Sequence, residues 1–568
     1  MQIVENYRVG NKVVQKVLRH AGTAKNEEEL DYLKQVAEYL KETLEDELYP
    51  KLFTKEELPK KKAKSHLEQV EAELPMLVNL HNLREEKRIT TGFHEVYGKL
   101  FDRVGYGNIL KSSKVSNQIF KDIVLARLAK PVSKRASCEM LAENFGISYN
   151  LEQIYRMLDA IKSEKKNAKK EIVLTDKIPA IQKVTYQYSK RLLNGKVTLF
   201  FYDCTTLYFE SFTEDELRRF GYSKDHKFNQ GQVLLALTVT DEGLPVGYEV
   251  FAGNMYEGDT FLLAINKLKE KYSIDEALVV ADSGLLSKAN IEIIKTSGFQ
   301  YILGARLKNL SQNWQKTILE NTDYETHTIF YKDREDKEKD TLQIKDYDYH
   351  KDSDHQIVER LIVSRSSARA AKDKKDREKA LGKLLLKFKK SANPKDLISN
   401  FGYKKYLRIE GETTVALNED KIANEELWDG LHGVFTNAKR SEQEAFAVLG
   451  QYHGLWQVEE SFRIEKHDLR MRPVFHWSSD RIKAHIAICF VAFSLIRFLQ
   501  HHIKEETNEL FSARRISMEL SSVQQSILYD IREKNNQYVI PSKANDNVLL
   551  IYKTMKLNRN AVPYKLKE

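Results

Sequence analysis

Three acidic residues stand where they could hold a metal ion together. Asp203 ends the apolar run LFFYD and Asp282 ends ALVVAD, so each acid is expected at the carboxyl end of a buried strand. This is the edge of the sheet at which α/β proteins bind ligands. For either aspartate alone a turn or a cap is the simpler explanation, because Asp is common after strands.

The third acid lies in residues 452–473, which we expect to form one helix. At about 100° per residue, Glu459 shares a stripe with Tyr452, Arg463, Lys466 and Arg470. A neighbouring stripe is apolar and consists of Leu455, Val458, Phe462 and Leu469. Glu459 therefore borders the buried face, whereas Glu460 should face solvent. An amphipathic surface helix with salt bridges would show the same periodicity.

Carboxylates without a cluster of His or Cys suit an ion that prefers oxygen ligands, such as Mg²⁺ or Mn²⁺. Two such ions stabilise both the attacking and the leaving oxygen of an in-line displacement. That is the chemistry needed to hydrolyse a phosphodiester and then to attack one with a 3′-hydroxyl. The cations beside Glu459 could hold the phosphates.

The elements around these acids predict an α/β core. KVTLFFYD, QVLLALTV and LPVGYEVF are expected to be strands, and GDTFLLAINKLKEKY a helix. The strand ALVVAD, the helix SKANIEIIKTSG and the strand QYILGAR follow. This is the order of a ribonuclease-H-like core, although many α/β folds share parts of it.

Residues 307–427 interrupt that core with a β-rich insertion. THTIFY, TLQIKDY, QIVERLIVSRS and YKKYLRIE are expected strands, and residues 365–390 a helix with eleven Lys or Arg against three acids. A charge run is usually a solvated face, but this excess of one sign also suits a helix that faces phosphates. LHGVFTN is again expected to be a strand, and a helical region is expected to begin near residue 442.

The N-terminal third is expected to be mainly helical. Residues 2–20 predict a hairpin, and residues 27–110 are helical in pattern. SKRASCEMLAENF and YNLEQIYRMLDAI, separated by Gly146, Ile147 and Ser148, fit a helix-turn-helix, although an ordinary helical hairpin has the same spacing. Five lysines in residues 162–170 predict a basic linker.

Composition agrees with a soluble, multidomain protein that meets a polyanion. The chain has 568 residues, 42% of them hydrophobic, and a net charge of +9. Cys138, Cys204 and Cys489 are widely spaced, which fits a reducing cytoplasm. The first residues show no signal-peptide pattern. The longest apolar run, Ile486 to Ile496, is too short for a bilayer and is expected to be a buried helix, so no membrane partner is expected.

Three blocks around the acids resemble those of DDE transposases from bacterial insertion sequences: FYDCTTLYFE, VVADSGLLSKANI and YHGLWQVEESFRIEKHDLRMRPVFHW. The branch they resemble is the superfamily of insertion sequence four, whose YREK signature is Tyr, two residues, Arg, three residues, Glu, six residues, Lys. Tyr452, Glu459 and Lys466 match at the right spacings. Leu455 stands at the Arg position, and Arg463 could substitute for it.

The resemblance spans roughly residues 115–500 and implies a ribonuclease-H-like core split by a β-rich insertion. It implies that Asp203, Asp282 and Glu459 bind metal, and that Tyr452 and Lys466 contact phosphates at the cut end. The implied activity is cleavage at element ends and strand transfer. The implied partners are double-stranded DNA, both terminal inverted repeats and target, and a second copy of the chain on paired ends.

We therefore expect six segments. Residues 1–110 form an N-terminal hairpin and helical region, 111–170 a helix-turn-helix-like DNA-binding region with its basic linker, and 171–306 the first part of the catalytic core. Residues 307–427 form the insertion, 428–505 the second part of the core, and 506–568 a C-terminal region.

Three other functions fit parts of the sequence. A nuclease with the same core would cut DNA without rejoining it. A domesticated DNA-binding protein would have lost catalysis, but all three acids are intact. An unrelated metal-dependent hydrolase of small phosphates would have no obvious use for the basic residues at 162–170 and 365–390.

Overall fold

The computed structural model describes residues 2–9, 12–20, scattered positions between 23 and 37, and residues 78–566 with short gaps. The gaps are 111–112, 167–171, 211–212, 222–229, 273–276, 286–290, 293, 295, 297, 331–338, 351–358, 391–404, 411–413 and 533–535. The chain divides into two compact units, Met1–His81 and Asn82–Glu568. In the first, β1 (Gln2–Val9) and β2 (Lys12–His20) form the predicted antiparallel hairpin. Most of the helix expected after residue 27 lies outside the described residues.

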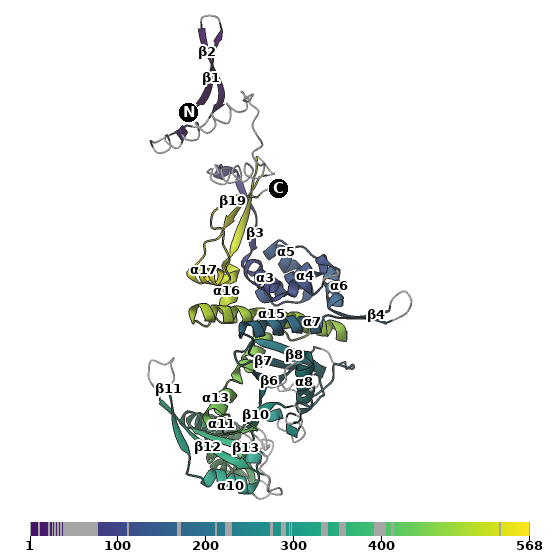
Figure 1. Cartoon of the computed structure of the whole chain (residues 1–568), viewed down its shortest axis with the longest axis vertical. Coiled ribbons are helices and arrows are strands. Elements are labelled where there is room, and N and C mark those ends of the chain that lie inside the picture. The colour runs from purple at the N-terminus through teal and green to yellow at the C-terminus, as the bar shows by residue number, and fades with distance from the viewer. Residues whose placement is uncertain are drawn as a thin grey trace. The chain divides into compact units, whose positions relative to one another are not determined.

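The second unit contains a nine-stranded sheet with the order β11-β12-β13-β16-β10-β9-β6-β7-β8 (Figure 1). Its core strands are β6 (Leu199–Tyr208), β7 (Gln232–Thr240), β8 (Pro245–Ala252), β9 (Leu278–Ala281) and β10 (Gln300–Ala305). β6, β9 and β10 are parallel, whereas β7 and β8 add to β6 antiparallel. The predicted strands and the helix α8 (Glu257–Tyr272) are confirmed. The helix expected at residues 287–298 lies largely outside the described residues.

The insertion extends the same sheet. β11 (Glu325–Phe330), β12 (Lys339–Tyr349) and β13 (Glu359–Ser366) join it through β16 (Leu431–Thr436), which pairs with both β13 and β10. The predicted basic helix is α11 (Ser367–Lys390). The smaller elements are α10 (Gln312–Glu320), β14 (Leu407–Glu410), β15 (Thr414–Leu417) and α12 (Glu419–Glu426). The insertion is therefore built onto the core sheet rather than around a sheet of its own.

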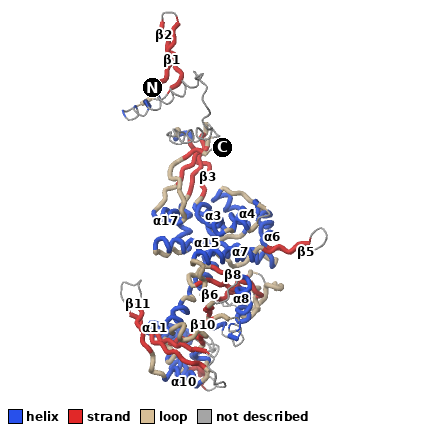
Figure 2. The backbone as a smooth tube through the Cα atoms, viewed as in Figure 1, coloured by secondary structure: helices blue, strands red, loops and turns tan. Residues whose placement is uncertain are grey.

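Helices pack in two layers on one side of the core strands (Figure 2). α7 (Ile178–Leu192) and α15 (Ser479–Thr507) contact β8. α3 (Gly92–Val104), α4 (Lys114–Ala129) and α6 (Leu151–Ile161) pack against α15, and α5 (Lys134–Phe145) packs against α4. Their apolar side chains share one core with the sheet, in which Phe120 and Val491 belong to the same cluster as Phe201. By length and mean hydropathy α15 could cross a membrane, but 94% of its most apolar window is buried within the protein.

Two N-terminal predictions are wrong. Residues 83–90 form a strand, β3 (Leu83–Thr90), because they pair with β17 (Gln524–Asp530). The expected linker is a hairpin of β4 (Lys162–Lys166) and β5 (Ile172–Asp176), since cross-strand pairing stabilises the extended backbone of the lysines. The C-terminal region adds α16 (Ala513–Ser522), β18 (Gln537–Pro541), α17 (Asp546–Thr554) and β19 (Tyr564–Lys565).

Candidate active site

Strand register brings Asp203 and Asp282 together. Tyr202 on β6 pairs with Ala281 on the parallel strand β9, so the two aspartates are the next residues along. Neighbouring strands lie about 4.8 Å apart. Tyr202 and Ala281 point into the core on the α8 side. Because side chains alternate along a strand, Asp203 and Asp282 point to the opposite face, toward α13–α15.

The sequence predicts that Asp203 ends its strand, but in the structure the strand continues beyond it. β6 continues to Tyr208 because its antiparallel pairing with β7 extends that far, whereas its parallel pairing with β9 stops at Tyr202. The aspartate is therefore at the edge of the parallel ladder, inside a longer strand. Its Oδ1 accepts a hydrogen bond from the Cys204 backbone N–H at 2.7 Å. Asp282 has the equivalent bond from the Ser283 N–H at 2.6 Å.

The expected single helix over 452–473 is instead a series of shorter turns. α13 (Ala445–His453) and α14 (Trp456–Arg463) are joined through Gly454 and Leu455, and a π-helical turn, Ile464–Asp468, follows. The backbone N–H groups of Leu455 and Val458 donate three residues back rather than four. This tighter winding changes which side chains of α14 face the core.

Gly454 passes directly over β6. A Cβ atom there would lie 2.4 Å from the Phe201 ring, whose residue is two before Asp203 on the same face of β6. Val458 and Phe462 are buried in the core that contains Phe201. α14 therefore lies over the face of the sheet to which the aspartates point.

Glu459 and Glu460 differ from the predicted exposure. Glu459 is exposed, whereas Glu460 is partly buried, with its side chain 29% exposed. Glu460 accepts two hydrogen bonds from Arg463, each 2.6 Å long. The expectation that Glu460 faces open solvent is wrong, because the tighter turn before α14 rotates that position toward the protein.

Tyr452 links α13 to Asp282. Its hydroxyl is hydrogen-bonded to Asp282, and its pKa is raised by burial and by the nearby charges of Asp282 and Glu459. The Tyr452 ring contacts His432 at 5.0 Å between centroids. Tyr452 thus contacts one proposed acid and lies within electrostatic reach of a second.

A cavity of about 290 Å³ opens beside Asp282 and Tyr452 and is also lined by Lys308, Arg369 and His432. Arg369 comes from the first turn of α11, in the insertion. Burial, together with Arg369 and His453, lowers the pKa of His432 to about 4, so the ring is neutral near neutral pH. Sequence patterns missed these three residues, since nothing in their local spacing relates them to the acids.

The predicted cations after Glu459 have separate environments. Arg463 is held by Glu460 and lies 3.4 Å from Asp468, so a phosphate would compete with two carboxylates for it. The Lys466 ammonium lies 5.6 Å from the centre of the Phe462 ring. Arg470 is exposed and has a left-handed backbone, with φ of 43°.

The donor set of Asp203, Asp282 and Glu459 consists of carboxylate oxygens and fits Mg²⁺ or Mn²⁺. The three groups do not all lie within 4.8 Å of one another. Across the described ranges, the three-residue group that meets this spacing is Glu242, His501 and Glu505. Glu242 follows the end of β7, near the amino end of β6, so that cluster is remote from the aspartates.

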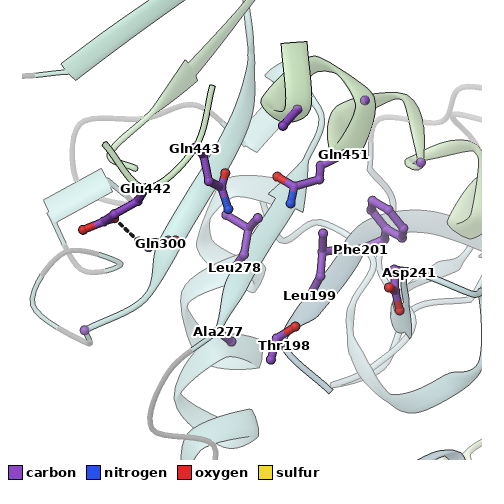
Figure 3. A pocket seen from close by; sticks show the side chains of 14 residues that line it. Thr198, Leu199, Phe201, Asp241, Ala277, Leu278, Gln300, Glu442, Gln443 and Gln451 are labelled. Carbon is purple, nitrogen blue, oxygen red and sulfur yellow. Dashed lines mark hydrogen bonds between the residues drawn. The ribbon is translucent and has the colours of Figure 1, made fainter. Parts of the chain in front are cut away.

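A second cavity, of about 900 Å³, lies at the amino ends of β6 and β9 (Figure 3). Leu199, Leu278, Gln443 and Gln451 line it, and Gln300 donates a 2.8 Å hydrogen bond to Glu442 at its rim. Because Asp203 and Asp282 stand toward the opposite ends of these strands, this larger cavity is not part of the acidic site.

Residues 198–495 match the model of the family described as "Transposase DDE domain". The chain is similar to the piggyBac transposase in its synaptic complex with hairpin DNA, at 8% identity over 76% of this chain and 78% of that chain, with a TM-score of 0.34. It is also similar to the Mos1 transposase in a paired-end complex with the left transposon end, at 11% identity over 49% and 78%, with a TM-score of 0.14. No curated protein matches the sequence.

Proposed function

The chain belongs to the family of DDE-domain transposases and is a metal-dependent enzyme of DNA transposition, and we propose that Asp203, Asp282 and Glu459 are its catalytic acids. The observation that supports this most is the pairing of Tyr202 with Ala281, which sets the two aspartates side by side beneath α14. We further propose that the core is ribonuclease-H-like, since the order β8-β7-β6-β9-β10 has three antiparallel strands followed by two parallel ones.

In this proposal the protein orients its own ligands before DNA arrives. The N–H groups of Cys204 and Ser283 hold one oxygen of each aspartate. The Tyr452 hydroxyl holds Asp282, and Glu459 completes the set from α14. Two Mg²⁺ or Mn²⁺ ions bound there would activate the attacking oxygen and stabilise the leaving one.

The phosphate contacts come from the cations near the acids. Lys466 and Arg470 follow Glu459 along the chain, and Arg463 would contact a phosphate only after leaving Glu460. Tyr452 reaches the same place from α13. Each such contact positions the strand without reading its sequence.

We assign the chain to the superfamily of insertion sequence four on the match of Tyr452, Glu459 and Lys466. Leu455, at the usual Arg position, is 8% exposed and belongs to the core, so it contributes packing rather than a phosphate contact. The proposed substrates are terminal inverted repeats and a target duplex. The proposed active form is a homodimer on paired ends.

The test is a cleavage assay on labelled element-end DNA, run beside a binding assay. Asp203→Ala, Asp282→Ala and Glu459→Ala should each abolish Mg²⁺-dependent nicking and strand transfer, while end binding without metal stays near wild type. Lys466→Ala should slow cleavage and weaken binding together, because it removes a phosphate contact.

Glu460→Ala is the matched control on the same helix. It releases Arg463, so cleavage should change little compared with the loss in Glu459→Ala. Loss in Glu460→Ala with activity kept in Glu459→Ala would move the third acid by one residue. Wild-type protein that binds ends but cleaves no end sequence with Mg²⁺ or Mn²⁺ would favour a non-catalytic DNA-binding protein.

A further inference from the structure

A cavity of about 670 Å³ between the N-terminal helices and the segment after the π-helical turn is lined by an excess of cations. Arg127 lies in the last turn of α4, and Lys134 and Arg135 begin α5. Arg470 and Arg472 come from the chain beyond Glu459. We name this cavity the cation pocket. No Asp or Glu occurs among the described residues that line it.

Lys134 is the residue whose burial needs explaining. It is 6% exposed, as is Arg127. The Arg127 guanidinium donates to the Leu469 carbonyl at 3.3 Å, but no described residue accepts a hydrogen bond from the Lys134 ammonium. Burial and the repulsion of Arg127 lower the pKa of Lys134 to about 7. A buried cation without a partner is costly, so an anion supplied from outside would stabilise it.

The N-terminal end of α5, the helix that contains Lys134, also favours a bound anion. α5 has 12 residues, and its first turn contains two cations and no acid. The positive end of a helix dipole disfavours cations and favours anions. The Ser133 hydroxyl caps the Ala136 N–H at 3.3 Å, and Lys134 and Arg135, the first two residues of that turn, line the cavity.

Arg470, on the opposite wall of the cation pocket, has a strained backbone. Its φ of 43° is left-handed, and the Met471 N–H donates back to the Glu465 carbonyl at 2.9 Å, as in a helix end where glycine is usual. An arginine in a glycine position costs stability, and such strain persists mainly where the side chain has a function.

We propose that the cation pocket binds a backbone phosphate of DNA through Arg127, Lys134 and Arg470. The proposal rests on the proposed function for the identity of the polyanion. A nucleic-acid strand fits better than a small free anion because aromatic rings lie exposed nearby, with Phe475 at 62% and Trp477 at 66%. Exposed rings beside cations are the usual surface for unpaired bases.

The pocket would connect recognition with catalysis. α4 and α5 belong to the N-terminal helices, whereas Arg470 follows Glu459 and Lys466 on one continuous segment. A DNA strand held in the pocket would therefore contact both the N-terminal helices and the segment that contains Glu459. The phosphate contact also predicts a pH signature, because an anion favours the charged form of Lys134.

The experiment measures binding of the full chain to labelled duplex DNA in EDTA, where cleavage is absent, over a range of KCl concentrations. Lys134→Met should reduce the slope of log Kobs against log[KCl] by about 0.9, the value for one lost phosphate contact. Lys134→Arg should keep the slope. Lys267→Met is the charge-matched control, because Lys267 is paired with Glu249 at 2.6 Å, on α8 and β8.

Binding should also take up protons above about pH 7 in wild type and not in Lys134→Met, measured by calorimetry in two buffers. Arg127, Arg135, His476, His485 and Cys489 face Lys134 from the neighbouring elements and are common to both proteins. A parallel titration with inorganic phosphate identifies the source of the anion.

Equal slopes and equal proton uptake in wild type and Lys134→Met would overturn the proposal while cleavage, and the proposed function, could stand. Tight binding of inorganic phosphate that is lost in Lys134→Met, with an unchanged DNA slope, would also overturn it in favour of a free anion. Absence of any DNA binding by the wild type would instead overturn the proposed function. A melting temperature of Lys134→Met at or above that of wild type shows that the variant folds.

Discussion

A Cβ atom on Gly304 would lie 2.5 Å from the Tyr452 hydroxyl oxygen. Leu303 on β10 pairs with Ala281 on β9, so Gly304 stands beside Asp282. The hydroxyl reaches Asp282 across the place where any other residue would have its side chain. The same Cβ would lie 2.9 Å from the Ser283 nitrogen, which donates to Asp282.

Gly304→Ala should therefore disable the site without touching an acid. The methyl group must displace Tyr452 or the backbone at Ser283, and either shift disturbs Asp282. We expect cleavage to fall at least about tenfold, or about 1.4 kcal/mol of barrier. Overpacking should cost about 1–3 kcal/mol of stability. The measurements are single-turnover cleavage and a thermal melt.

Gly382→Ala is the control, because it lies on α11 with nothing within 4 Å of the added Cβ. It should leave cleavage unchanged and stabilise the helix slightly. Wild-type cleavage by Gly304→Ala would mean that Tyr452 does not orient Asp282.

Arg369→Ala tests the contribution of the insertion to the site. Arg369 lines the cavity beside Asp282 although it belongs to α11. Removing a cation from the cavity beside Asp282 should slow cleavage by about tenfold or more, with a smaller effect on overall DNA affinity. Lys375→Ala, on the exposed side of the same helix, should lower affinity at most. Equal effects of both variants on the cleavage rate of bound DNA would remove Arg369 from the site.

The three acids are proposed from sequence on local signals, and that assignment stays a prediction. Asp203 and Asp282 each follow a run of apolar residues, and β6 and β9 have the expected positions. The strand length around Asp203 could not be predicted, since it depends on pairing with β7, which is distant in sequence. The predicted exposure of Glu459 and Glu460 was wrong for a related reason. The prediction assumed a uniform helix of about 100° per residue, whereas the backbone turns more tightly at Leu455.

The corrections elsewhere have the same physical origin. Residues 83–90 have charged side chains that tolerate helix or strand, and pairing with β17 decides the outcome. Lys308, Arg369 and His432 meet only because β16 brings the insertion onto the core sheet. Contacts of this kind depend on tertiary packing rather than on local propensity.

The shared core also predicts how the chain can be shortened. A protein of residues 82–568 should fold with the melting temperature of the full chain, because residues 1–81 form a separate compact unit. Deleting residues 1–170 should instead cause aggregation or unfolding. That deletion removes Phe120 and Leu158 from the core that contains Val491, so it cannot test recognition of element ends as a simple domain deletion would.

Circular dichroism and size exclusion of both truncated proteins check this prediction. A folded, monodisperse protein of residues 171–568 would show that α3–α6 are an independent domain. Recognition by the helix-turn-helix-like pair α5 and α6 is then better tested with surface variants. Arg156→Ala on α6 is suitable, because its side chain is 70% exposed and paired only with Glu152 among the interactions described.

Glu465 should make the stability of the protein depend on pH. It lies in the π-helical turn, is 1% exposed, and neither carboxylate oxygen has a hydrogen-bond partner among the described residues. Burial raises its pKa from 4.5 to about 8. The folded protein therefore holds a proton that the unfolded chain releases between these two values. The contribution of Glu465 to stability should be greatest below its unfolded pKa and should fall as pH rises to about 8, by up to about 1.4 kcal/mol per pH unit.

Glu465→Gln should remove this dependence, because the amide keeps the shape of the protonated acid without its proton. The measurement is urea unfolding of wild type and variant between about pH 5 and about pH 8. The difference in the free energy of unfolding should grow with pH in favour of the variant. Glu152→Gln, at a surface ion pair with Arg156, is the control and should show no such trend. A constant difference between wild type and Glu465→Gln over this range would mean that Glu465 is already ionised in the folded protein, and its burial would then require a cation at the π-helical turn.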